Sequence, residues 1–118
     1  MEELKALIAL AALAQGTRLQ LFRLLVIRGP TGMSAGTIAE HLAVPPSSLS
    51  FHLQQLTHAG LVSQRRLGRQ VIYSAEYGVM TALLAYLSDN CYRQGAARAP
   101  ACNPVASGIA AAAKSDAA

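Results

Sequence analysis

The chain has 118 residues, a net charge of +4 and a pI near 9.5, and 53% of its residues are hydrophobic. This length suits one domain with a modest core, which favours pairing with a second copy, and the positive charge favours an anionic partner. No apolar run reaches the roughly 18–20 residues that span a bilayer. Acidic Glu2 and Glu3 precede the apolar run 7–14, where a signal peptide would be basic. We therefore expect a cytoplasmic protein with no membrane partner and no structural disulfide.

The first half of the sequence predicts four helices from apolar spacing and capping residues. A helix over 2–14 has an apolar face made by Leu4, Leu7, Ile8 and Ala11. Thr17 is expected to cap a second helix, which ends at Gly29-Pro30 and carries one apolar face made by Leu19, Phe22, Leu25 and Val26. Ser34 is expected to cap a short helix that reaches Leu42. After Pro45-Pro46, Ser47 or Ser48 is expected to cap a helix that ends at His58, before Gly60.

After Gly60 the period changes from helical to two. Strands over 61–66 and 70–74 flank the turn Leu67-Gly68-Arg69, which predicts a hairpin. A last helix should run from Tyr77 to Cys91. We expect residues 1–92 to form the folded domain and residues 93–118 to form a flexible tail rich in Ala, Gly and Pro.

The two helices around Pro45-Pro46 predict a helix-turn-helix motif. In the second helix Leu49, Leu53 and Leu56 should face the core, and the outward or N-terminal positions are then candidates for DNA contact. The candidates on this helix are Ser47, Ser48, Ser50, Phe51, His52 and Gln55. Phe51 is equally compatible with a thymine methyl contact and with packing against the neighbouring helix, and His52 favours a partly buried structural role.

Residues 44–75 contain no Asp or Glu but carry three arginines, at 65, 66 and 69. Basic residues on a strand are often only a solvated face. Here they follow a helix-turn-helix, and Arg69 in the turn is the main candidate for a phosphate contact on a wing. Arg65 and Arg66 point to opposite faces of a strand, so at most one can follow the same DNA backbone, and Arg65 is taken as the second candidate. The sequence shows no acidic pair and no glycine-rich phosphate loop, so we do not expect an enzyme.

Several motifs resemble the ArsR/SmtB family of metal-responsive repressors over roughly residues 4–92. They are the Thr-Arg-Leu triplet at 17–19, Ser-x-His-Leu at 50–53, Ala-Gly-Leu-Val at 59–62 and Gly-Arg-Gln-Val-Ile-Tyr at 68–73. The resemblance implies a mainly α winged helix-turn-helix homodimer with a small β-hairpin, paired through its first and last helices. It also implies a repressor that binds double-stranded operator DNA and leaves it on binding metal. By matching position, Ser47, Ser48, Ser50 and His52 would lie in or beside the groove, with Arg69 on the wing.

The family places its metal ligands at several sites, and this sequence lacks two of them. The helix before the turn has no cysteine, and the last helix has no histidine. What remains, Cys91 and Cys102, resembles arsenic repressors that place a Cys-Cys pair at the helix end and a third Cys nearby, although Tyr92 here replaces one Cys. Trivalent arsenic or antimony prefers thiolates. Two thiolates suit methylated As(III), or inorganic As(III) or Sb(III) completed by another ligand.

Two other functions are compatible with the residues. A winged-helix DNA-binding regulator could respond to a redox or non-metal trigger, with the cysteines redox-active or inert. A winged helix can also serve as a protein-interaction module, and a salt-dependent loss of DNA affinity would argue against that use.

Overall fold

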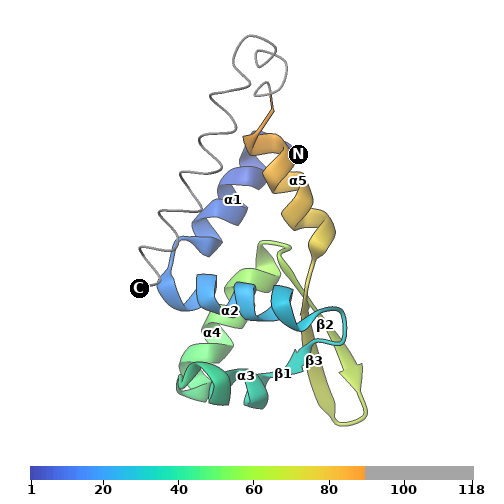
Figure 1. Cartoon of the computed structure of the whole chain (residues 1–118). Helices are drawn as coiled ribbons and strands as arrows, with labels where there is room; N and C mark the ends of the chain where they lie inside the picture. The colour runs from blue at the N-terminus through green and yellow to red at the C-terminus, as the bar shows by residue number, and fades with distance from the viewer. Residues whose placement is uncertain (90–118) are drawn as a thin grey trace. The chain divides into compact units, whose positions relative to one another are not determined.

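The computed structural model describes residues 1–89, within which the chain forms five helices and a three-stranded antiparallel sheet (Figure 1). The elements follow in the order α1 (Glu3–Leu13), α2 (Gly16–Arg28), β1 (Met33–Ser34), α3 (Ala35–Leu42), α4 (Pro46–His58), β2 (Val62–Leu67), β3 (Gln70–Ala75) and α5 (Tyr77–Leu87). The chain divides into two compact units, Met1–Leu83 and a second one that begins at Leu84. This order confirms the predicted mainly α, winged helix-turn-helix class.

The helix boundaries confirm some of the predicted caps and correct others. The Ser34 side chain accepts a hydrogen bond from the Thr37 amide (3.3 Å), as predicted for the cap of α3. The cap of α2 is Gln15 rather than Thr17, because the Gln15 side chain accepts from the Arg18 amide at 2.9 Å. Helix α4 has Pro45 as its N-cap and no side-chain cap. Proline at its first position lacks an amide that would need a partner.

Two further boundaries differ from the prediction. Ser47 and Ser48 lie inside the first turn of α4 rather than capping it. Helix α5 ends at Leu87 rather than at Cys91, which lies outside the described residues. The predicted tail at 93–118 lies outside them too, so the domain boundary at 92 stays a prediction.

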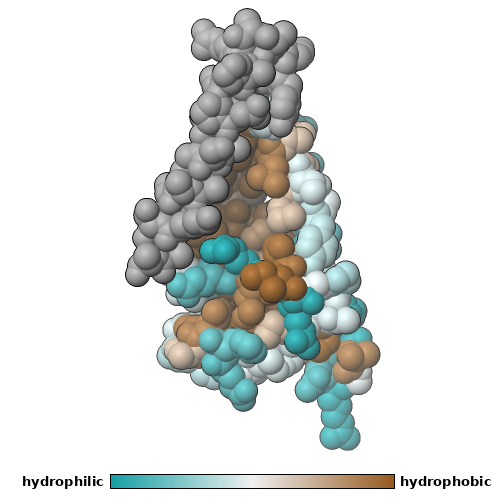
Figure 2. Space-filling model, in the orientation of Figure 1, coloured by the Kyte–Doolittle hydropathy of each residue, from teal (hydrophilic) through white to brown (hydrophobic). Residues whose placement is uncertain are grey.

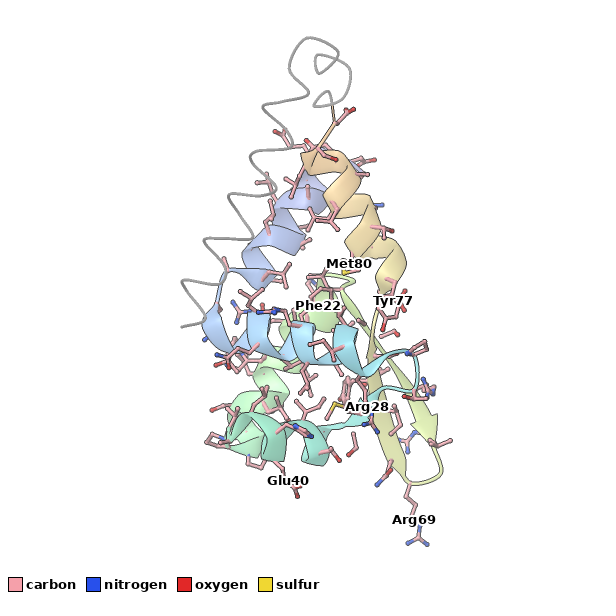
Figure 3. The ribbon with its side chains drawn as sticks, in the orientation of Figure 1. Phe22, Arg28, Glu40, Arg69, Tyr77 and Met80 are labelled. Atoms are coloured by element: carbon pink, nitrogen blue, oxygen red, sulfur yellow. The ribbon has the colours of Figure 1, made fainter. Side chains whose placement is uncertain are left out.

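The core lies where α2, α3 and α4 meet. Its fully buried side chains are Leu21, Leu25, Ile38, Leu49, Leu53, Leu56 and Leu61. Burying each such side chain stabilises the fold by about 1.5–3 kcal/mol. Leu21, and not the predicted Leu19, is the inward leucine at the start of α2, while Leu19 is 46% exposed. At the other end of α2, the hydroxyl of Tyr77, the first residue of α5, donates a hydrogen bond to the Val26 carbonyl (3.2 Å; Figure 3).

Helix α1 packs through alanines and leaves its larger apolar side chains outside. Its buried residues are Ala6, Ala9 and Ala12. The predicted apolar face is exposed instead: Leu4 is 66% exposed, Leu7 56% and Ile8 43%. Small inward side chains allow a close approach of α1 to its neighbours, and they leave a leucine-rich surface available to another molecule.

Within residues 1–89, no single helix is both long and apolar enough to cross a membrane. Helices α1 and α2 meet that criterion only as a pair, and the pair is bent by 102° at the break between them.

The sheet has a third strand that the sequence pattern did not predict. The two residues of β1 pair with β3, with Met33 opposite Tyr73 and Ser34 opposite Ile72. The hairpin itself has Leu67 opposite Gln70, so Gly68 and Arg69 alone form its turn. Gly68 has a φ of +64°, as the first turn residue of a type II′ hairpin requires.

Gly32 joins α2 to β1 in a position that only glycine fits. Its φ is +71°, and a Cβ there would collide with the Tyr73 carbonyl oxygen and lie 2.8 Å from the Ile72 Cγ2. The missing side chain therefore allows β1 to lie against β3.

We expect Gly32→Ala to destabilise the protein more than Gly68→Ala. Both positions have positive φ, which costs a substituted residue about 1–2 kcal/mol. Only Gly32 adds a collision with β3, which costs about 1–3 kcal/mol more, because a Cβ at Gly68 meets nothing within 4 Å. Urea unfolding of the two variants measures the difference. Equal losses would contradict the packing of β1 against β3.

Candidate nucleic-acid interface

The rotation of α4 about its axis is fixed by its buried leucines. Leu49, Leu53 and Leu56 are at most 2% exposed. Helical spacing then places a line of side chains on the opposite side, facing solvent. The exposed residues of α4 that carry polar or aromatic side chains are Ser47, Ser48, Ser50, Phe51, Gln54, Gln55 and His58. None of them is Asp or Glu, so this face offers hydrogen bonds without a carboxylate that would repel a polyanion.

A groove with a volume of about 400 Å³ separates α4 from the hairpin. Ser50 and Gln54 line it from α4, and Gln64 and Tyr73 line it from the sheet. The sheet face that carries Gln64 and Tyr73 therefore faces α4. Polar side chains from the helix and from the hairpin therefore line the same groove.

Strand alternation assigns the hairpin arginines to different faces. Arg66 shares the face of Gln64 and so lies on the side turned toward α4. Arg65 lies on the other face, where its guanidinium donates to the carbonyls of Pro30 (3.1 Å) and Thr31 (2.9 Å). Arg65 thus ties the hairpin to the loop after α2. Its contact with DNA stays a prediction, but this geometry favours Arg66.

Arg69 lies at the end of the hairpin and points away from the rest of the protein (Figure 3). Figure 2 shows hydrophilic surface at this end of the hairpin. Arg69 thus lies in the turn, as expected, and a guanidinium there is free to approach a phosphate, but this contact stays a prediction.

His52 faces the corner between α1 and α2 rather than the outer surface. The Arg18 side chain donates to the Ala12 carbonyl through Nε (2.6 Å) and lies 3.3 Å from the His52 Nδ1 through Nη1. Arginine can only donate, so Nδ1 is the acceptor and the neutral ring carries its proton on Nε2. Burial, and then the Arg18 charge, lower the pKa of His52 below its usual 6.5. A partly buried structural role is the one that the leucine pattern of α4 favoured for His52.

Gln55 lies on the same flank of α4 as His52. It lines a second groove together with Ala11, Ala12 and Arg18. The predicted contact residues of α4 therefore divide into two groups. Ser47, Ser50 and Phe51 occupy the outer surface or the hairpin side, whereas His52 and Gln55 face the α1–α2 corner and helical spacing places the exposed Ser48 on the same flank as these two.

Two residues join the candidate interface that the sequence analysis did not select. Gln54 is exposed beside the groove, and Arg66 lies on the face of the sheet that borders this groove, together with Gln64. Helical spacing from Leu53 could have identified Gln54. The choice between Arg65 and Arg66 required the hairpin register and the carbonyls of the α2–β1 loop. DNA contact by every residue of this interface remains a prediction.

The predicted metal ligands Cys91 and Cys102 lie outside the described residues. Within residues 1–89, no group of three His, Cys, Asp or Glu side chains is placed to hold a metal ion.

Comparisons with known proteins agree with this geometry. Residues 13–65 match a family model described as a helix-turn-helix domain. HlyU from Vibrio cholerae is 34% identical, with a TM-score of 0.59 over 74% of this chain and 97% of HlyU; HlyU has also been solved in its reduced form. An ArsR-like regulator from Rhodococcus sp. RHA1 is 25% identical, with a TM-score of 0.66 over 86% and 92% of the two chains.

A third similar structure comes from Mycobacterium bovis. It is the homodimeric winged helix-turn-helix DNA-binding domain of Mb0332, a possible ArsR-family regulator, with 29% identity and a TM-score of 0.59 over 76% of this chain and 83% of that one. No curated protein matches the sequence at a significant level.

The fold and the exposed face of α4 define a winged helix-turn-helix DNA-binding protein. The comparisons narrow this class further, and the chain belongs to the ArsR family of winged-helix transcriptional regulators.

We expect His52 to make stability depend on pH. Because the folded-state pKa of His52 is lowered, the unfolded chain binds a proton at a pH where the folded chain does not. The contribution of neutral His52 to the free energy of unfolding is therefore fully present above pH 6.5. It is lost as the pH falls from 6.5 through the lowered folded-state pKa. His52→Asn keeps an acceptor for Arg18 but removes this titration. Urea unfolding on both sides of pH 6.5 should show a smaller acid loss in the variant, and identical pH profiles would contradict the assignment.

Proposed function

We propose that this protein is a homodimeric repressor in the cytoplasm that binds double-stranded operator DNA as an apo dimer. It is released when trivalent arsenic, as As(III) or methyl-As(III), or Sb(III) binds Cys91 and Cys102. The observation that carries the DNA-binding part is the outer face of α4, which lies beside an arginine-bearing hairpin in a segment, 44–75, that has no Asp or Glu.

This surface suits duplex DNA in both of its parts. Ser47, Ser50 and Gln54 supply short hydrogen-bonding side chains that can reach base edges when α4 lies in a major groove. Arg66 and Arg69 supply charge for the phosphates beside that groove. Phosphate contacts fix the position of the protein, and the α4 side chains then select the sequence.

The proposed dimer uses the exposed apolar face of α1. Leu4, Leu7 and Ile8 cover one side of this helix and have no core to enter. The similar Mycobacterium bovis domain is homodimeric. Two copies related by a two-fold axis would present two α4 helices to successive major grooves of a two-fold operator.

The proposed inducer follows from the chemistry of the two cysteines. Thiolates are soft ligands and bind soft trivalent metalloids. Joining Cys91 to Cys102 would constrain the chain that follows the last helix and bias the dimer toward a geometry that fits DNA less well. Coupling of this kind is worth about 1–3 kcal/mol, which lowers operator affinity roughly fivefold to 150-fold.

A redox trigger is the second candidate, because the same two cysteines can be joined by oxidation. The similar HlyU from Vibrio cholerae has been solved in a form described as reduced. In this version a disulfide between Cys91 and Cys102 replaces the metalloid, and the DNA-binding surface is unchanged.

We expect the hairpin arginines to differ in the salt dependence of DNA binding. Arg66→Gln and Arg69→Gln should each reduce the slope of log K against log salt by about 0.9, the value for one phosphate contact. Arg65→Gln is the matched control. It should leave the slope unchanged and lower the free energy of unfolding by about 1 kcal/mol, because it loses its bonds to the Pro30 and Thr31 carbonyls. A reduced slope in Arg65→Gln alone would reverse the assignment.

We expect Cys91→Ser and Cys102→Ser each to abolish release from DNA by trivalent metalloids. Fluorescence anisotropy of reduced, full-length protein on its selected operator would be followed during titration with As(III), methyl-As(III), Sb(III) and Zn(II). Release of the wild type by a metalloid at one equivalent per site supports the proposal. A Cys91→Ser protein that still leaves the operator on adding As(III) contradicts it. Release by diamide without metalloid, reversed by dithiothreitol, supports the redox trigger.

A further inference from the structure

We propose that Phe51 reads sequence by contacting the C5 methyl group of a thymine in the major groove. This inference rests on the proposed function, since it requires α4 to lie against operator DNA. It adds an apolar, sequence-selecting contact to an interface that otherwise consists of hydrogen-bonding and charged side chains.

Phe51 is an exposed aromatic side chain on the side of α4 that faces away from the core. Its exposed fraction is 53%, while the other phenylalanine, Phe22, is 5% exposed in the core. The buried Leu49 and Leu53 on either side of it in sequence fix the rotation of α4, so Phe51 cannot turn inward without removing them from the core. Its exposure is thus imposed by the packing of α4.

The neighbours of Phe51 on the helix surface are polar and uncharged. Ser47 and Ser48 precede it and Gln54 and Gln55 follow it at helical spacing, and all four are exposed. A protein-binding patch would be expected to join several apolar side chains. Here one apolar ring stands among hydrogen-bonding side chains. Its complement is a partner surface that is mostly polar and carries a single apolar group.

The major groove is such a surface. Each base pair presents donors and acceptors there, and the thymine C5 methyl is its apolar feature. Phenylalanine forms no conventional hydrogen bonds, so it can distinguish base pairs only through apolar contact or shape. Removing one methyl or methylene from an apolar contact costs about 0.8 kcal/mol, which corresponds to about fourfold in affinity.

The ring of Phe51 is also held in place before any DNA arrives. It contacts the His52 ring edge-on, with centroids 5.7 Å apart and planes inclined by 64°. The His52 ring in turn accepts from Arg18, which donates to the Ala12 carbonyl. Side chains that are ordered beforehand lose less conformational entropy on binding.

The test removes one methyl group at a time from the DNA. Full-length reduced protein would select duplexes from a random library, and each thymine of the selected half-site would then be replaced by deoxyuridine, which lacks only the C5 methyl. At one thymine in each half-site, this replacement should weaken wild-type binding about fourfold. Phe51→Ala should bind the thymine and deoxyuridine duplexes equally, and Phe51→Leu should retain part of the difference.

Ile27→Ala is the matched control, because it removes an exposed apolar side chain (77% exposed) from α2, outside the interface. It should keep the fourfold difference, and urea unfolding should show that Phe51→Ala is folded. The inference is overturned if deoxyuridine has no effect on the wild type, if its effect persists in Phe51→Ala, or if the selected half-site contains no thymine. Failure to enrich any two-fold sequence would instead refute the proposed function, and this inference with it.

Discussion

The burial of three leucines on one side of α4 is the constraint on which the interface depends. Leu49, Leu53 and Leu56 enter the core against α2 and α3, and this fixes both the position of α4 and its rotation. Each side chain on the outer surface then has a defined direction before any partner arrives. A rotation of α4 would expose one of the leucines, at a cost of about 1.5–3 kcal/mol, so the packing energy of the core also maintains the orientation of the candidate interface.

The register of the hairpin plays the corresponding part for the charged residues. Pairing of Gln64 with Tyr73 places both beside the groove along α4, and the next residue on that face is Arg66. A shift by one residue would exchange Arg65 and Arg66 between the faces. The two bonds from Arg65 to the loop after α2 oppose such a shift, since only Arg65 on the far face can reach the Pro30 and Thr31 carbonyls. Arg65 therefore contributes to the interface by fixing the position of its neighbour.

The order of the helices, the hairpin and the inward leucines of α4 could be predicted from the sequence, because they follow from local periodicity and from glycine and proline positions. Strand β1 could not, because its two residues show no period and are held by pairing with β3. The predicted cap of α2 at Thr17 was wrong, because the Gln15 side chain caps this helix instead. Arg65 and Arg66 could not be separated, because both are exposed and the difference depends on a loop some 34 residues away in sequence.

The pattern of α1 was visible in the sequence, but its direction was not. Alternating alanines and leucines allow either face to turn inward, and the larger residues would gain more from burial in an isolated chain. The structure buries Ala6, Ala9 and Ala12, and across the short connection between α1 and α2 the Arg18 side chain donates to the Ala12 carbonyl. Since Arg18 also contacts His52, the end of α1 is connected to α4 through two hydrogen bonds. The contacts that order Phe51 therefore begin at the end of α1, the helix whose outer face carries the exposed Leu4 and Leu7.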